Sequence, residues 1–139
     1  MSASRTLAII KPDAFGAGLA GKILARLEGE GFRVLAARVL HLNETQAGRF
    51  YAVHRERPFF APLIRFMTSG PCMPLALECE DAVTKLRRVI GATDPAEAEP
   101  GTIRALYAES VERNAIHASD SDENAAFELA FFFPAADLP

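Results

Sequence analysis

Residues 5–11, Arg-Thr-Leu-Ala-Ile-Ile-Lys, are an apolar run of strand length that ends at Pro12. A short apolar run bounded by a proline is typical of a buried strand. Leu19, Ile23 and Leu27 follow at four-residue spacing and predict one apolar face of a helix. The chain is therefore expected to begin with a buried strand that leads into a helix.

The rest of the chain continues this alternation. Strand character covers residues 32–42, 72–78 and a short run that ends at 115–117, and helices are predicted over residues 44–54, 62–67, 82–90 and 121–133. The predicted order is βαβααβαβα, without repeats or linkers. Residues 91–103 (GATDPAEAEPGTI) form a long loop of the kind that a compact domain usually keeps for binding.

Several polar residues and one proline mark the ends of these elements. Asn43 and Asp81 are expected to cap the helices that follow them, and Asp120 with Glu123 is expected to form a capping pair. Pro74 lacks a backbone N–H donor, which suggests an edge position or an irregular start for its strand.

Length and charge limit the classes of function. The 139 residues fit one domain, residues 1–139, with 50% hydrophobic and 24% charged residues. A formal net charge of −3 disfavours bulk electrostatic binding to nucleic acid, so any anion site must be local. The apolar runs are far shorter than the roughly 20 residues of a membrane span, and no signal-peptide pattern is present. Cys72 and Cys79 fit reduced thiols, so we expect a cytoplasmic location.

The first loop carries two nucleotide-binding patterns that we interpret as accidental. Residues 16–21 (GAGLAG) satisfy GxGxxG, but no acidic residue between Glu30 and Glu44 is available to bind a ribose 2′-hydroxyl. With Lys22 the same segment satisfies GxxxxGK, but Ile23 replaces the hydroxyl residue that holds magnesium in a P-loop. The glycines are expected only to allow a tight entry into a helix.

His117 is the most informative single residue. It lies in residues 114–121 (NAIHASDS), among small residues between an apolar run and a helix start. A positioned imidazole can carry a covalent intermediate without a metal, and Glu128 in the following helix could orient its ring. The types of side chain that suit a polyphosphate are scattered elsewhere: Lys11, Arg87, Thr93 and Arg104. Arg88 is expected to be a solvated surface charge. Tyr51 and Phe59 by type alone fit the core better than a ligand site, and Asn114 fits a turn.

Six motifs in order resemble the nucleoside diphosphate kinase family over nearly the whole chain. They are TLAIIKPD (6–13), RPFF (57–60), FMTSGP (66–71), GATDP (91–95), GTIR (101–104) and NAIHASD (114–120). The resemblance implies an α+β, ferredoxin-like fold with a four-stranded antiparallel sheet covered by helices. A parallel doubly wound sheet is not expected.

The resemblance also implies an activity and a role for each site residue. The enzyme would transfer the γ-phosphate of a nucleoside triphosphate, mainly ATP, to nucleoside or deoxynucleoside diphosphates through a phosphohistidine. His117 would be the nucleophile, supported by Glu128 and Ser119, with Lys11 and Tyr51 close by. Phe59 would stack on the base and Asn114 would contact the sugar with Lys11. Arg87, Thr93 and Arg104 would hold the phosphates, and Mg²⁺ would bind mainly through nucleotide oxygens rather than protein ligands.

Two positions depart from the family pattern, and two other classes of function compete. Ala118 and Cys79 stand where the family usually has glycine. If residue 118 needs a positive φ, its methyl group costs roughly 1 kcal/mol; if not, it is harmless.

The competing classes of function are a binding module that has lost its activity and a phosphohistidine carrier that phosphorylates a protein. The family forms homo-oligomers; a tetramer is favoured, and the apolar tail at residues 131–138 is a candidate for a subunit boundary.

Overall fold

The apolar run at residues 5–11 forms most of the central strand β1 (Ala3–Ile10) in a computed structural model that describes residues 3–139. Strand β1 pairs antiparallel along its whole length with β3 (Met73–Glu80), and with β4 (Ile116–Ala118) on its other side. Strand β2 (Arg33–Ala37) pairs antiparallel with β3, giving the order β2-β3-β1-β4. The predicted four-stranded antiparallel sheet is confirmed.

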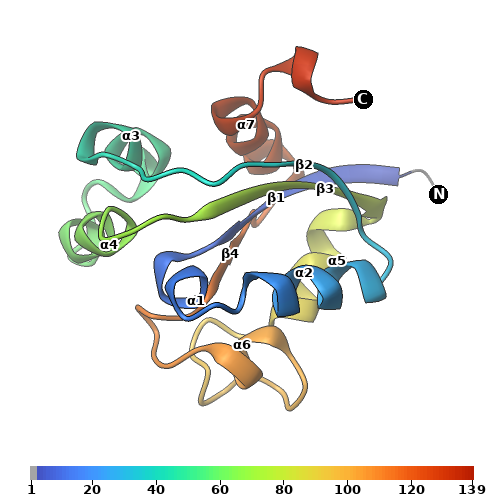
Figure 1. Cartoon of the computed structure of the whole chain (residues 1–139). Helices are drawn as coiled ribbons and strands as arrows, with labels where there is room; N and C mark the ends of the chain where they lie inside the picture. Colours follow the sequence, from blue (N-terminus) through green and yellow to red (C-terminus); the bar gives the residue numbers. More distant parts are fainter. Residues whose placement is uncertain (1–2) are drawn as a thin grey trace.

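Helices connect and cover the strands (Figure 1). The α-helices are α1 (Pro12–Gly16), α2 (Ala20–Gly29), α3 (Glu44–Phe50), α4 (Phe60–Met67), α5 (Ala82–Ile90), α6 (Ile103–Tyr107) and α7 (Asp122–Phe132). Two 3₁₀ turns, η1 (Ala52–His54) and η2 (Ala135–Asp137), complete the elements. Helices α1 and α6 were not predicted, because five residues are too few to show an apolar period.

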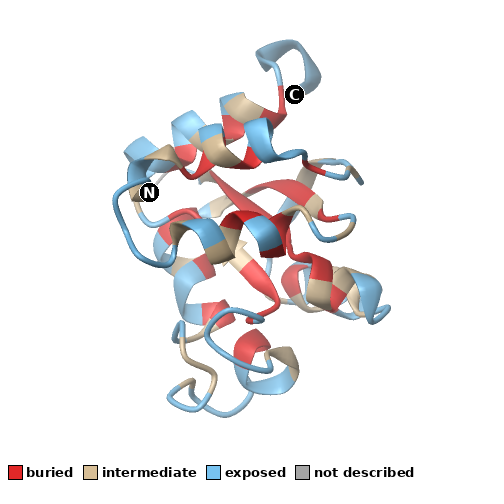
Figure 2. Cartoon of the chain, turned by 90° about the vertical axis from the view of Figure 1, so that its left-hand side faces the viewer, coloured by how far each residue is buried: buried red, intermediate tan, exposed pale blue. Residues whose placement is uncertain are grey.

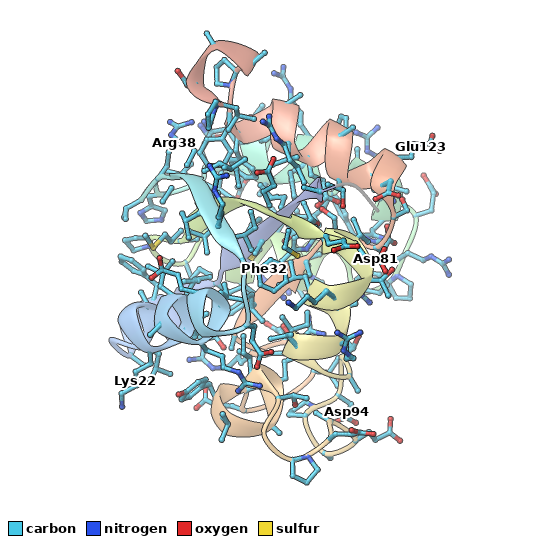
Figure 3. The ribbon with its side chains drawn as sticks, turned by 90° about the vertical axis from the view of Figure 1, so that its right-hand side faces the viewer. Lys22, Phe32, Arg38, Asp81, Asp94 and Glu123 are labelled. Atoms are coloured by element: carbon cyan, nitrogen blue, oxygen red, sulfur yellow. The ribbon has the colours of Figure 1, made fainter. Side chains whose placement is uncertain are left out.

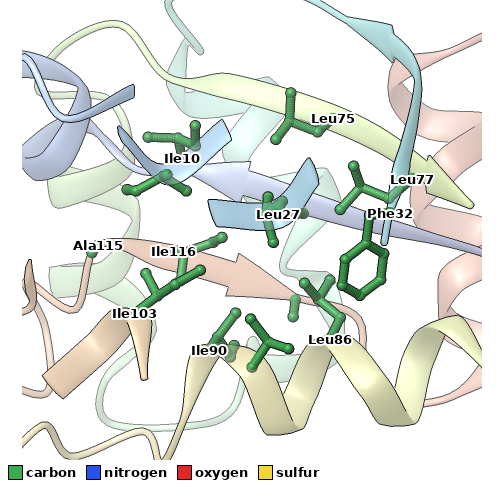
Figure 4. Packing of buried hydrophobic residues seen from close by; sticks show 14 of the residues in the cluster. Ile10, Leu27, Phe32, Leu75, Leu77, Leu86, Ile90, Ile103, Ala115 and Ile116 are labelled. Atoms are coloured by element: carbon green, nitrogen blue, oxygen red, sulfur yellow. The ribbon is translucent and has the colours of Figure 1, made fainter. Parts of the chain in front are cut away.

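Alternate residues of β1 build two separate cores, one on each face of the sheet. Ala8 and Ile10 face a cluster with residues of α2 and α5, part of which is drawn in Figure 4. Leu7 and Ile9 face a second cluster with residues of α3, α4 and α7. Figure 2 shows the buried residues along the strands and the inner sides of these helices. The central strand is therefore buried on both faces, as its continuous apolar run predicts.

Two of the three predicted helix caps differ from the structure. Asn43 forms a capping box with Gln46, as predicted. Asp81 (labelled in Figure 3) adopts a left-handed conformation in which its side chain makes no capping bond, and the Ser4 hydroxyl accepts the Ala82 N–H instead. Ser121, rather than Asp120, caps α7 by accepting the N–H of Asn124.

Pro74 and the C-terminal tail also correct the expectations. Pro74 is the second residue of an interior strand rather than of an edge strand. It lies just beyond the last regular pair with β2, Ala37–Leu75, where its carbonyl still accepts the N–H of Arg38 at 3.2 Å although it has no N–H to donate in return. The tail is less exposed than expected, since Phe132 and Phe133 are buried and Leu138 packs against the same core. Arg38 donates to the carbonyl of Phe132 at 2.9 Å. No helix within residues 3–139 is long and apolar enough to cross a membrane.

Candidate active site

A cavity of about 820 Å³ gathers most of the predicted site residues. Its walls come from η1 and the start of α4 on one side, from β4 and α7 on the other, and from loops at residues 93 and 111–114. The predicted residues that line it are Lys11, Tyr51, Phe59, Arg87, Thr93, Arg104, Asn114, His117 and Glu128. Ser119, the remaining one, is buried directly behind Glu128. The GxGxxG segment does not line the cavity.

The His117 ring is held by a carboxylate on its inner side. Nε2 of His117 lies 2.7 Å from Oε1 of Glu128, and the Ser119 hydroxyl donates to the same oxygen at 2.8 Å. An N–H on Nε2 satisfies this carboxylate and leaves a lone pair on Nδ1. Within residues 3–139 no hydrogen bond occupies Nδ1. The geometry therefore presents Nδ1 as the free nitrogen of a neutral imidazole.

Aromatic side chains pack against the same ring. The ring centroid of His117 lies 5.3 Å from that of Phe50 and 5.9 Å from that of Tyr51, both in edge-to-face arrangements. Burial lowers the pKa of His117, although its hydrogen bond to Glu128 opposes that shift. Burial also raises the pKa of Tyr51, whose hydroxyl has no hydrogen-bond partner within the described residues. The histidine is thus neutral at pH 7 and faces a protonated phenol.

Lys11 is buried and tied to the long loop through one amide. Its Nζ donates to Oδ1 of Asn114 at 2.8 Å, and Nδ2 of Asn114 donates to the carbonyl of Thr93 at 3.2 Å. Desolvation, together with the nearby charge of Arg104, lowers the pKa of Lys11 to about 8. Lys11 is only 7% exposed, and within the described residues no carboxylate forms an ion pair with it. A polyanion in the cavity would supply the missing counter-charge.

Two arginines extend this positive wall. Arg104 is 4% exposed and donates to the carbonyls of Gly91 and Ile116, while its Nε has no partner within residues 3–139. Burial and the charge of Arg87 lower its pKa to about 10. Arg87 is exposed and donates to the carbonyl of Ala118 at 3.1 Å. Arg88, as expected, is exposed and lies outside this cavity.

Phe59 stands at the mouth of the cavity and is unusually exposed for its size, at 48%. Val111, on a loop across the cavity, is 55% exposed. His54 packs against Phe59 at a centroid distance of 5.2 Å. Phe59 and Val111 are thus exposed apolar side chains that line the same cavity, and the Phe59 ring offers a face on which a flat apolar group can stack.

Several residues of the site were missed by the sequence analysis. His54, Val111, Glu112 and Asp120 line the cavity. His54 follows Tyr51 by three residues, a spacing that puts both on one side of a helical turn and could have indicated it. Val111 and Glu112 lie in an irregular loop that offers no such period. No group of three or more potential metal ligands occurs within residues 3–139.

The backbone conformation around His117 is strained at Ala115 rather than at Ala118. Ala118 lies in β4 and is not among the described residues with positive φ. Ala115 is: its φ is 75°, and the N–H of Ile116 bonds back to the carbonyl of Asn114 at 2.9 Å. This is a γ-turn of the rare, strained kind. Cys79 lies inside β3 rather than in a turn, with its side chain against the core.

Comparison with known proteins gives one consistent result. Residues 4–138 match the family model described as nucleoside diphosphate kinase. The nucleoside diphosphate kinase of Dechloromonas aromatica is 57% identical over 134 residues, 96% of this chain and 94% of that protein. The one from Delftia acidovorans is 54% identical over 138 residues, 99% of this chain and 98% of that protein.

Solved structures agree. The Aquifex aeolicus nucleoside diphosphate kinase superposes with a TM-score of 0.97 at 46% identity, covering 99% of this chain and all of that one. A Halobacterium salinarum nucleoside diphosphate kinase in complex with CDP superposes with a TM-score of 0.94 at 37% identity, covering 99% and 92% of the two chains. The chain therefore belongs to the nucleoside diphosphate kinase family and is a nucleotide-binding phosphotransferase.

Proposed function

We propose that Nδ1 of His117 carries the phosphoryl group between the two nucleotides. The observation that supports this assignment is the bond from Nε2 to Glu128, which directs the other nitrogen into the cavity. The Nδ1 lone pair attacks the γ-phosphorus, the bond to the β–γ bridging oxygen breaks, and the nucleoside diphosphate leaves with that oxygen. A terminal oxygen of a second diphosphate then attacks the phosphorus and the P–N bond breaks. Ser119 and Glu128 keep the ring in one tautomer throughout.

The cationic side chains of the cavity stabilise the charge of the transferring group. Arg87 and Arg104 bind phosphate oxygens as forks, Lys11 adds a point charge, and Thr93 adds a hydroxyl. The Tyr51 hydroxyl, buried without a hydrogen-bond partner within residues 3–139, donates to an oxygen of the same group. Mg²⁺ bound to the nucleotide phosphates would supply further charge neutralisation.

Nucleotide recognition in this proposal depends on stacking rather than on reading the base. Phe59 and Val111 enclose the base, while Lys11 and Asn114 contact the sugar. Every base has a π face, so this slot accepts all common bases with or without a ribose 2′-hydroxyl. Donor and acceptor then share one site in two half-reactions, and ATP is the main donor. The reaction maintains the pools of nucleoside and deoxynucleoside triphosphates.

The test follows the phosphoryl group itself. The parent is incubated with γ-labelled ATP and magnesium and then given GDP or CDP, beside His117→Gln and the matched control His41→Gln. His41 is exposed and bonded to the carbonyl of Thr68, outside the cavity. We expect the parent and His41→Gln to take up an acid-labile, base-stable label and return it to either diphosphate, and His117→Gln to do neither.

Other results would favour one of the two competing functions. Label that stays on the protein when GDP or CDP is added would favour a phosphohistidine carrier. Turnover retained by His117→Gln would overturn the assignment of the nucleophile, and a parent without turnover would favour the binding module.

We also propose one domain over residues 1–139, a cytoplasmic location and a homo-oligomer with a tetramer favoured. Two free cysteines support the location. The buried tail phenylalanines weaken the tail as a subunit boundary, and sedimentation will determine the number of subunits.

A further inference from the structure

We propose that Asp13 is a positioning residue for the phosphotransfer reaction, acting through the backbone of Ala115 to hold the strained turn that seats Asn114 and His117. This inference rests on the proposed role of His117. Asp13 lies in α1 and does not line the cavity. It therefore affects the reaction through other residues.

The contact is a single side-chain bond to a strained residue. Oδ2 of Asp13 accepts the N–H of Ala115 at 3.0 Å, across 102 positions of sequence. Ala115 has a φ of 75°, a region that alanine rarely adopts and that persists only where its surroundings impose it. Ala115 is fully buried among the core residues next to Ile116 (Figure 4). No other side chain within residues 3–139 hydrogen-bonds to its backbone.

The turn joins the two halves of the site. Asn114, directly before it, binds Lys11 and the loop carbonyl of Thr93. Ile116 and His117, directly after it, enter β4, where His117 pairs with Ile9. If Ala115 relaxed to a negative φ, the direction of the chain between Asn114 and His117 would change. Both the amide at Lys11 and the imidazole would then leave their positions.

The state of the carboxylate supports a positioning role over a purely stabilising one. Oδ1 of Asp13 is buried with no hydrogen-bond partner within the described residues. Leaving a carboxylate oxygen in this state opposes folding. The other oxygen of this carboxylate accepts the Ala115 N–H, so the unfavourable burial is explained if that bond serves the site. The negative charge of Asp13 also lies near Lys11, so the experiment must separate the hydrogen bond from the charge.

Three changes make that separation. Asp13→Ala removes both acceptor and charge, whereas Asp13→Asn keeps an acceptor oxygen and removes the charge. Ala115→Gly removes the need for the bond, because glycine adopts positive φ without steric cost. The readouts are the single-turnover rate of His117 phosphorylation at saturating ATP, the KM for ATP, and thermal unfolding of each protein.

We expect Asp13→Ala to slow phosphorylation by about tenfold or more, since displacing a reacting group by an ångström can cost that much. Asp13→Asn should stay within about threefold of the parent, the rescue that a bond-based role requires. In the Ala115→Gly background, Asp13→Ala should lower the phosphorylation rate by no more than about threefold. The effects of the two substitutions would then be non-additive, as expected for residues that act through one contact. If Asp13→Ala folds only when residue 115 is glycine, the thermal unfolding data will show that the conformation of the turn depends on this hydrogen bond.

Three results would overturn the proposal: a parental rate in Asp13→Ala, an Asn variant as slow as the Ala variant, or an equal loss in both backgrounds. The second result would assign Asp13 a charge effect on Lys11 instead. The parent and His117→Gln are run alongside. Absence of label in the parent would contradict the proposed nucleophile, whereas label in the parent with an unaffected Asp13→Ala would contradict this inference alone.

Discussion

Glu128 Oε1 accepts hydrogen bonds from two residues of one strand-to-loop segment, Nε2 of His117 at 2.7 Å and Oγ of Ser119 at 2.8 Å. The two donors fix the carboxylate, and the carboxylate in turn fixes the histidine tautomer. The proposed nucleophile, His117, is thus oriented by α7, an element that begins after it in sequence.

The first prediction concerns this carboxylate. Glu128→Ala should lower the single-turnover phosphorylation rate about 10²-fold, because the ring loses both its orientation and the preferred tautomer. Ser119→Ala should have a smaller effect, since Glu128 keeps its bond to His117. Nucleotide binding, measured by calorimetry, should change little in either protein. An equal loss in both variants would mean that Glu128 cannot orient the ring without the Ser119 hydroxyl, contrary to this prediction.

Tyr51 should show opposite effects on stability and activity. Its buried hydroxyl has no partner within residues 3–139, so Tyr51→Phe removes an unsatisfied group and should raise the free energy of unfolding by about 1 kcal/mol. The same change removes the donor that we propose for the transferring phosphoryl group, and the phosphorylation rate should fall several-fold. Urea unfolding and single-turnover kinetics check the two effects. A more stable variant with unchanged kinetics would assign the hydroxyl no part in the reaction.

The strands and long helices could be predicted from sequence because each has an apolar pattern of its own. The antiparallel pairing could not be derived from these patterns and came from the family resemblance. The caps show the limit of local reasoning: Asp81 has a capping side chain, but its left-handed backbone and the distant Ser4 decide what binds Ala82. A hydrogen bond from the N–H of residue 82 to the side chain of residue 4 leaves no pattern in the local sequence.

The site shows the same division. His117 is one of three histidines and lies at an identifiable boundary, so sequence could single it out, whereas Glu128 and the basic residues are common types whose separate roles came from the family resemblance. The strained turn at Ala115 could not be predicted, because alanine normally indicates ordinary backbone. Ala115 has a positive φ, and its N–H bonds to Asp13, which is 102 positions away. For the same reason, sequence reasoning looked for strain at Ala118 rather than three residues earlier.

Ala118→Gly should therefore bring no gain. Ala118 lies in a strand and is not among the described residues with positive φ, so glycine relieves no strain there. Glycine inside a strand costs roughly 0.5–1 kcal/mol in conformational entropy, and we expect the free energy of unfolding to fall by about that amount. The turnover rate should stay within about twofold of the parent. A faster variant would show that the alanine methyl group hinders the nucleotide.

The pH dependence of substrate capture should reveal Lys11. Burial and Arg104 lower its pKa to about 8 in the folded protein, from 10.5. As pH rises through about 8, the free enzyme loses this charge, and kcat/KM for ATP, which reports the free enzyme, should fall. Lys11→Arg should move this limb to higher pH, because arginine stays protonated there. Stability should change in the opposite sense: between pH 8 and 10.5 the unfolded chain binds a proton that the folded protein does not, so the free energy of unfolding should rise with pH. A kcat/KM that stays flat across this range in the parent, or a falling limb at the same pH in Lys11→Arg, would show that another group controls capture.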